Sequence, residues 1–321
     1  MDKRLVDKRL VDKRLGLHLG LLALLVVGHF VSPVYHHSNL AKIMVLAVYA
    51  MGYNIAFGYT GLLSLGHALF FASGLYAAGM LISVGGWSAG PAMAAGVLAG
   101  GAMAVAVGML ALRTTGVAFM IVTLMFAQAG YLTILYLGTW TRGDEGIVIA
   151  QAARAIGGID LSDDNTRYIA ALALFAVALL INLALVLSPR GRVMVAMREN
   201  EERARMLGYN PFAVKLTALS ISGLYAGAAG AAYAVMFGYV GANFASVQYS
   251  ILPLLWVLLG GAGTVMGPFI GVLVMFYLID TASSVPSATL LVVGVALVAL
   301  VLFAPAGLLG TIRDRWLKWL P

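Results

Sequence analysis

Long apolar stretches constrain this chain more than any other feature of its sequence. Five of them run over residues 17–34, 40–58, 89–112, 116–138 and 168–187. Each approaches or exceeds the roughly 18 to 20 residues that a helix needs to cross a hydrocarbon core about 30 Å thick. Because 62% of the residues are apolar and the mean hydropathy is +0.96, a water-soluble domain is excluded. The sequence predicts an all-α, polytopic membrane protein.

The first apolar run is long for the core of a signal peptide. No clear small-x-small cleavage site follows it before the next run, so we expect a retained helix. The chain contains no cysteine, which excludes disulfides, thiol catalysis and thiolate metal sites.

Lys and Arg cluster in the N-terminal tail, between Arg190 and Arg205, and in the C-terminal tail. Cytoplasmic segments of membrane proteins carry an excess of these residues, so we place all three regions and both termini in the cytoplasm. Sixteen of the 20 basic residues then face inward. The net charge of +7 therefore reflects topology and does not indicate a nucleic-acid partner. Residues 139–167, with five acids and three arginines, become an extracytoplasmic loop.

These assignments divide the chain into three parts. Residues 1–16 form a basic cytoplasmic tail, residues 17–310 a transmembrane domain and residues 311–321 a second cytoplasmic tail. Residues 189–211 are the longest cytoplasmic connection. The first tail repeats DKRLV, which we interpret as a solvated segment that holds the N-terminus at the anionic lipid surface. A lipid-binding or regulatory role for this repeat is the alternative.

With six earlier spans, of which five are the long stretches above, four later apolar segments bring the predicted number of spans to about ten. They cover residues 212–239, 251–262, 265–279 and 289–304. The second and third are short, and Pro268 and several glycines interrupt them. Two interpretations stay open for this pair: ordinary tilted helices, or broken half-helices that line a cavity.

Small residues recur at intervals of three or four in two of the apolar stretches. The first series is Gly96, Gly100, Ala104 and Gly108, and the second is Gly223, Ala226, Gly227 and Gly230. Such series let helix backbones approach closely inside a membrane. They indicate helix packing and not chemistry.

The predicted spans hold no Asp, Glu, Lys or Arg near their centres. Proton relays need such groups, so their absence lowers the expectation of an ion-driven carrier. The interior polar groups are neutral and suit a polar or zwitterionic solute. We name four of them as a candidate substrate pathway: Asn54, Ser64, His67 and Gln128. His67 has no second ligand at metal-binding spacing, so we interpret it as a hydrogen bonder, and we expect no active site or cofactor in this chain.

The segment MRENEERARMLGYN, Met197 to Asn210, carries six charged residues in fourteen. Its acids and bases stand at i, i+4 spacing, which predicts a short surface helix. The predicted pairs are Glu199 with Arg203, Glu201 with Arg205, and Arg198 with Glu202. Gly208 suits a left-handed C-terminal cap, and Asn210 with Pro211 blocks continuation. Ala204, Met206 and Leu207 form a small apolar contact face.

Three separated motifs give the chain a resemblance to a known family. AMRENEERARMLGYNPFAVKLTALSISGLYAGAAGA resembles the cytoplasmic EAA-type loop of ABC importer permeases, in the version of the branched-chain amino-acid (LivM-type) permeases. GYTGLLSLGHALFFASGLYAAGML and LLGGAGTVMGPFIGVLV are similar to an early and a late Gly-rich segment of the same family. The motifs occur in the family's order, and the resemblance covers roughly residues 40–310.

The resemblance implies a mechanism and a set of partners. The loop helix of such permeases docks into a groove on a separate ATPase subunit, and two pseudo-inverted halves of five helices form the membrane domain. The residues that match the coupling loop are Arg198, Glu199, Glu201, Ala204 and Gly208. None of the chain's six lysines follows a glycine, so it has no Walker A motif and ATP would be used by partners. The implied partners are a LivH-like permease, two ABC ATPases and an extracytoplasmic binding protein, at a bacterial plasma membrane.

The outer loop departs from the family's common Thr-Gly-Gly-x-x-Gly-Leu pattern, because Arg142 replaces the first glycine. The candidate outer-loop residues are Arg142, Gly143, Asp144 and Gly146. Arg142 could favour a carboxylate-bearing solute or contact the binding protein. The alternative is a solvated loop residue. The expected solutes are branched-chain or related hydrophobic amino acids, with urea, short amides or aromatic carboxylates as alternatives. A secondary carrier, a channel and a membrane enzyme stay open, and each would leave Met197 to Asn210 without a docking role.

Overall fold

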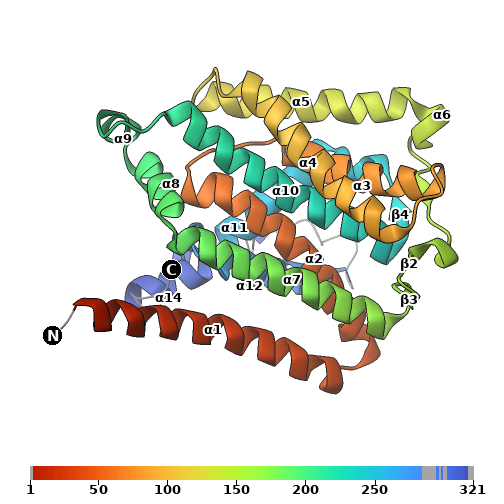
Figure 1. Cartoon of the computed structure of the whole chain (residues 1–321), viewed down its shortest axis with the longest axis horizontal. Coiled ribbons are helices and arrows are strands. Elements are labelled where there is room, and N and C mark those ends of the chain that lie inside the picture. The colour runs from red at the N-terminus through yellow and green to blue at the C-terminus, as the bar shows by residue number, and fades with distance from the viewer. Residues whose placement is uncertain (1–2, 284–293, 296–297, 299–301, 317–321) are drawn as a thin grey trace.

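A computed structural model of the chain describes residues 3–283, 294–295, 298 and 302–316. Its long helices run side by side between two ends of the molecule (Figure 1). Within these described residues, six helices are long and apolar enough to cross a membrane. They are α1 (Lys3–Val31), α2 (Val34–Asn54), α4 (Ala89–Ala111), α5 (Val117–Tyr136), α7 (Asp164–Leu187) and α10 (Pro211–Phe237). Three shorter apolar helices join them: α3 (His67–Ser83), α11 (Val247–Gly260) and α12 (Gly267–Ala282).

The helices agree with the predicted spans over the described part of the chain. The last predicted span, residues 289–304, lies largely outside the described residues, so the number ten stays a prediction. At the N-terminus, α1 begins at Lys3 and passes residue 16 without a break. The DKRLV repeats therefore belong to the same helix as the first span, because nothing in them stops a helix.

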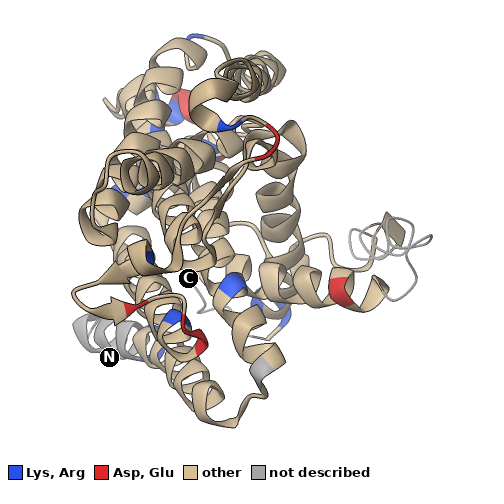
Figure 2. Cartoon of the chain, turned by 90° about the vertical axis from the view of Figure 1, so that its right-hand side faces the viewer, with Lys and Arg blue, Asp and Glu red and all other residues tan. Residues whose placement is uncertain are grey.

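The two ends of the bundle carry different segments. The start of α1 lies at one end together with α8 (Pro189–Glu199), α9 (Glu201–Met206) and α14 (Gly307–Arg315), and the loop after α5 lies at the other (Figure 1). The predicted cytoplasmic segments thus share one end, opposite the predicted extracytoplasmic loop. Figure 2 turns that loop toward the viewer and shows Lys, Arg, Asp and Glu as small patches on a mostly uncharged ribbon.

Three of the four strands of the described structure lie in the outer loop. After α6 (Gly138–Thr141), strand β1 (Ile147–Val148) pairs antiparallel with β4 (Tyr239–Val240), which follows α10. A 3-10 turn, Gln151–Arg154, precedes a hairpin of β2 (Ala155–Ile156) and β3 (Ile159–Asp160). The all-α expectation is therefore correct except for these two-residue strands. Ser162 donates to the half-buried Asp160 carboxylate and lowers the pKa of that group.

The two series of small residues, predicted to serve helix packing, face each other. A Cβ built on Gly100 in α4 would lie 2.5 Å from Cα of Gly227 in α10. A Cβ on Gly74 in α3 would lie 2.3 Å from the carbonyl oxygen of Gly227. Real side chains do not fit at such distances, so three helix backbones meet where only glycine is tolerated.

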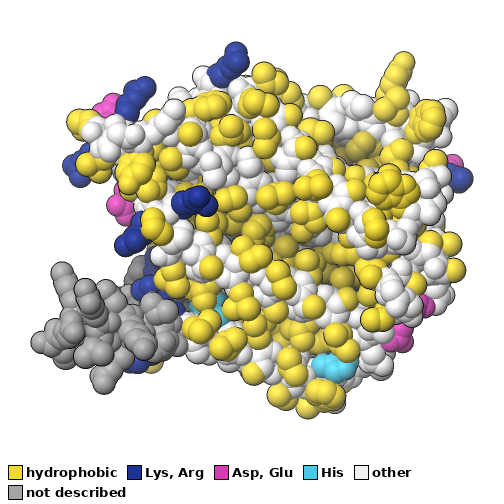
Figure 3. All heavy atoms as spheres, in the orientation of Figure 1, with side chains coloured by type: hydrophobic (Ala, Val, Ile, Leu, Met, Phe, Trp, Pro, Cys, Tyr) yellow, Lys and Arg dark blue, Asp and Glu magenta, His cyan; other side chains and the backbone are white. Residues whose placement is uncertain are grey.

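Hydrophobic side chains cover most of the face seen in Figure 3, and Lys and Arg gather toward its left edge. A hollow of about 440 Å³ lies in the membrane-spanning part, lined by apolar and aromatic side chains of α2, α4, α7 and α10. Hydrophobic residues thus face outward over the length of the spans, as a lipid environment requires.

Candidate coupling site and substrate pathway

Two irregular segments interrupt the bundle, and we call them the first and the second broken segment. The first comprises residues 55–66, where α2 passes into a π-helical turn (Ile55–Tyr59) and then an irregular stretch before α3. The second comprises residues 261–266, between α11 and α12. Since α11 has 14 residues, it extends only about 21 Å. The choice between tilted helices and half-helices that line a cavity stays open for this region.

Side chains from other helices satisfy the buried backbone of the first broken segment. The Leu65 amide donates to Thr123 Oγ1 of α5 at 3.2 Å, and the Ala68 amide donates to Ser250 Oγ of α11 at 3.0 Å. Irregular backbone at membrane depth is stable only where such partners exist. Thr123 and Ser250 were not among the predicted site residues, because nothing near them in sequence marks this role.

Asn54 joins the two broken segments to each other. Its Oδ1 accepts from the Gly263 amide at 2.9 Å, and its Nδ2 donates to the Thr264 carbonyl at 2.9 Å. The Asn54 side chain is completely buried. A substituent at Gly58 would clash with Gly263, since a Cβ there would lie 2.6 Å from the Gly263 amide nitrogen. The early and late Gly-rich motifs therefore meet in space.

The structure brings three of the four predicted pathway residues into one buried region. Tyr53 lies between two of them: its hydroxyl donates to the Ser64 carbonyl at 3.1 Å, and its ring meets that of His67 at 4.6 Å. His67 Nε2 lies 2.7 Å from Ser222 Oγ, which agrees with the interpretation of this histidine as a hydrogen bonder. Gln128 is half-buried on α5, and no hydrogen bond joins it to the others.

Asn54, Ser64 and His67 have no solvent-exposed surface at all. A solute cannot reach these side chains in this conformation. Their assignment to a substrate pathway stays a prediction, and the structure adds that the pathway would have to open before they could bind anything.

The charged segment forms two helices, so the prediction of one was wrong. Helix α8 ends at Glu199, and Asn200 adopts an extended conformation with φ −159° and ψ 103°. The Asn200 side chain then caps α9 by accepting from the Arg203 amide at 2.9 Å. An asparagine that can cap a new helix competes with continuation of the old one.

The predicted i, i+4 ion pairs are not present. The break at Asn200 separates Glu199 from Arg203 and Arg198 from Glu202, which removes the helical spacing that the pairs need. Glu201 instead pairs with Lys215 of α10, with 2.6 Å between Nζ and Oε2. Tertiary contact with the next span therefore replaces the local pairing within the loop.

The end of α9 confirms the predicted glycine cap and contradicts part of the predicted apolar contact face. Gly208 has φ +89°, and its amide donates to the Arg205 carbonyl at 2.9 Å, so the predicted glycine cap is confirmed. Ala204 is only 2% exposed and is not available as a docking surface. Met206 and Leu207 remain, at 79% and 76% exposure.

Arg198 has an internal partner. Its guanidinium donates from Nη1 to the carbonyl of Gly58 in the first broken segment, although the residue as a whole is exposed. Glu199, next to it, lines a cavity of about 490 Å³ with mixed polar and apolar walls. The cavity lies between residues 189–211, which we call the coupling loop after their predicted role, the first broken segment and the α4–α5 turn. The coupling loop thus contacts the region of the predicted pathway.

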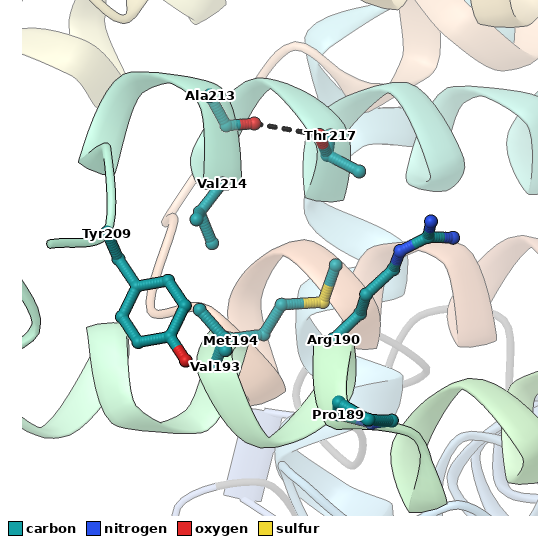
Figure 4. Close-up of a pocket in the computed structure, with 8 residues that line it drawn as sticks. All are labelled: Pro189, Arg190, Val193, Met194, Tyr209, Ala213, Val214 and Thr217. Carbon is teal, nitrogen blue, oxygen red and sulfur yellow. Dashed lines mark hydrogen bonds between the residues drawn. The ribbon is translucent and has the colours of Figure 1, made fainter.

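A second cavity, of about 350 Å³, separates α8 from α10 (Figure 4). Its lining is largely apolar and includes Val193 and Met194 of α8, Tyr209 of the loop and Val214 of α10. On this side α8 is not packed tightly against its neighbour.

The outer-loop residues form a tight turn. Arg142 has φ +58°, the one positive value among the non-glycine residues that the structure describes, and its carbonyl accepts from Glu145 and Gly146. Gly143 and Gly146 also have positive φ. The glycine that the family pattern has at position 142 would adopt this backbone without strain. Arg142 and Asp144 are exposed, and no structural feature decides between the two roles open for Arg142.

Helices of spanning length with irregular segments buried among them define the chain as a polytopic membrane protein. The sequence profile of the family described as "branched-chain amino acid transport system / permease component" matches residues 37–303. The chain belongs to this family, and it is an integral membrane protein.

Relatives of the chain are named as permeases of the same kind. The chain is 29% identical to the high-affinity branched-chain amino acid transport system permease protein LivM of Escherichia coli, over 85% of this chain and 69% of that protein. It is 28% identical to LivM of Salmonella typhimurium, with the same coverage. A probable LivM of Methanocaldococcus jannaschii is 36% identical over 27% of this chain and 25% of that protein. No solved structure matches the chain.

Proposed function

We propose that the chain is one membrane subunit of an ABC importer in a bacterial inner membrane and forms half of the translocation pathway for branched-chain or related hydrophobic amino acids. Its partners would be a second, LivH-like permease, two ATPase subunits that use ATP, and an extracytoplasmic binding protein. The chain itself would hydrolyse nothing. The names of the relatives support the solute class, since each is a branched-chain amino acid permease.

The observation that carries the proposal is the exposed tip of the loop between α7 and α10. Met206 and Leu207 project there at the end of the bundle that also holds α14. Large apolar side chains with so much exposed surface mark an interaction site on a protein whose lipid-facing surface lies elsewhere. A groove on an ATPase subunit would cover them.

The finer organisation is part of the same proposal. Ten spans in two pseudo-inverted halves, with both termini in the cytoplasm, would place Met206 and Leu207 inside and Arg142 outside. The chain has no cysteine, so a single cysteine introduced at Leu207 or at Asp144 would be the one site that a thiol reagent can label. Labelling by a reagent that cannot cross the membrane would show on which side each residue lies.

The test is solute uptake by the reconstituted complex of both permeases, both ATPases and the binding protein. We expect ATP-dependent uptake of leucine, isoleucine and valine. The double variant Met206→Asp with Leu207→Asp should lose binding of the ATPase subunits and lower uptake at least tenfold, because charged groups would enter an apolar groove.

Trp316 provides a matched control, because it is exposed to 83% at the end of α14 and lies outside the loop. Trp316→Asp should keep uptake near the wild-type rate. Uptake without any ATPase would instead indicate a carrier or channel. Uptake of urea, short amides or aromatic carboxylates in preference to leucine would support the ABC importer class but contradict the proposed solute.

A further inference from the structure

Arg198 lies where three parts of the chain meet. It is the penultimate residue of α8, and its guanidinium donates to the Gly58 carbonyl of the first broken segment. It also reaches the second broken segment, because a Cβ built on Gly263 would lie 2.9 Å from Arg198 Nη1. One side chain of the coupling loop therefore touches both broken segments.

Glycines make room for this side chain. A Cβ built on Gly61 would lie 3.0 Å from Arg198 Cγ, so a larger residue there would crowd the arginine. Gly61 and Gly263 both have positive φ, at +77° and +73°. Because these glycines of the two Gly-rich motifs have no side chains, the arginine side chain can extend into the interior.

The Gly58 carbonyl is a favourable acceptor for a cation. It lies in the π-helical turn that ends α2, where carbonyl groups lack the amide partners of a continuing helix. The C-terminal end of a helix also carries a partial negative charge. A hydrogen bond from a charged donor to such a group is worth about 1.5 to 3 kcal/mol.

Other contacts hold the second broken segment beside this acceptor. Asn54 already bridges Gly263 and Thr264 to the first broken segment. Arg313 of α14 donates to the Gly263 carbonyl at 3.3 Å. The cavity of about 350 Å³ between α8 and α10 leaves α8 room to shift toward α10. A displacement of α8 would therefore pull directly on Gly58.

We propose that Arg198 is a positioning residue that links the coupling loop to the two broken segments, so that displacement of the loop separates or closes them. This inference rests on the proposed function and revises the role that the family resemblance gave this residue. Arg198 acts on the core of its own chain, whereas Met206 and Leu207 contact the ATPase.

The first experiment uses the reconstituted complex with Arg198→Gln and Arg198→Lys. For Arg198→Gln we expect the ATPase subunits to remain bound, while the number of solute molecules transported per ATP falls at least tenfold. Arg198→Lys keeps the charge but not the planar fork of donors, so its loss should be smaller. Arg203→Gln is the matched control, because Arg203 is exposed in the same loop and contributes a backbone cap.

A second measurement needs only the purified chain. Thr264 is 3% exposed beside Gly263, and Thr264→Cys introduces the one thiol of the protein. The thiol should be protected from an impermeant reagent in the parent and react at least tenfold faster when Arg198→Gln is added.

The outcomes separate this inference from the proposed function. If the wild-type chain never assembles with an ATPase, the proposed function fails, and thiol protection still tests the link. If Arg198→Gln releases the ATPases, Arg198 is a docking residue and the inference is wrong. It is also wrong if that variant keeps wild-type transport per ATP or leaves the thiol protected.

Discussion

The outer loop and the coupling loop are the two large connections of this chain, and they are attached to the bundle by different forces. Backbone hydrogen bonds hold the outer loop: β1 pairs with β4, and the Ile149 amide donates to the Gly238 carbonyl at 2.9 Å. Side chains hold the coupling loop, through Arg198 to Gly58 and Glu201 to Lys215. Paired backbone fixes one register, whereas long charged side chains can exchange partners when a helix moves. The comparison indicates a fixed outer surface and a movable inner one.

The largest effect is expected at the cap of the coupling loop. Gly208→Pro cannot keep φ +89° and loses the bond from its amide to Arg205, which costs about 3 kcal/mol or more. We expect ATP-driven uptake to fall to background while the chain still inserts in the membrane. Charge reversal at Glu199 and Glu201 should act in the same direction. Uptake at the wild-type rate in these variants would contradict the assignment of the loop.

A matched pair of alanine substitutions sharpens the comparison between the loops. Gly146 and Gly208 both have positive φ, but a Cβ on Gly146 would lie 2.7 Å from the Val240 carbonyl, and a Cβ on Gly208 meets nothing within 4 Å. Gly208→Ala should lower the free energy of unfolding by about 1 to 2 kcal/mol, from backbone strain alone. Gly146→Ala should cost about 2 to 4 kcal/mol, because overpacking adds to the strain.

Equilibrium unfolding in mixed detergent micelles would measure both changes. If both alanine variants lost the same free energy of unfolding, the backbone at Gly146 would not be packed closely against β4. The contrast between the two loops would then be wrong.

The smallest effect is a gain of stability at the outer turn. Arg142→Gly relieves about 1 to 2 kcal/mol of left-handed strain and loses about 0.5 to 1 kcal/mol through the extra freedom of glycine in the unfolded chain. The net expectation is about 0.5 to 1 kcal/mol of stabilisation in the same unfolding measurement. Binding of the extracytoplasmic protein, followed in parallel, separates the two roles of Arg142: weaker binding identifies a contact, and unchanged binding a solvated residue.

The parts of the fold that depend on local sequence were predictable. Span positions follow from runs of apolar residues, and the cap at Gly208 follows from a glycine placed after a short charged helix. The packing role of the two glycine series was predictable as well from their spacing, whereas their contact with each other was not predicted.

The site was less predictable because its contacts join distant parts of the chain. Nothing local to Asn54 indicates Gly263, and nothing local to Arg198 indicates Gly58. The missed break at Asn200 has a different cause. The i, i+4 charge pairs would have contributed about 0.2 to 0.5 kcal/mol each, which is less than the roughly 1 kcal/mol of a capping side chain.

The glycine contact among α3, α4 and α10 limits the kinds of motion available to the permease. Backbones that touch at Gly74, Gly100 and Gly227 cannot slide past one another, because the neighbouring turns carry side chains that would collide. Shear between these three helices is therefore blocked, and they would tilt as one rigid block. Any alternation of access has to take place at the edges of that block, where the broken segments lie.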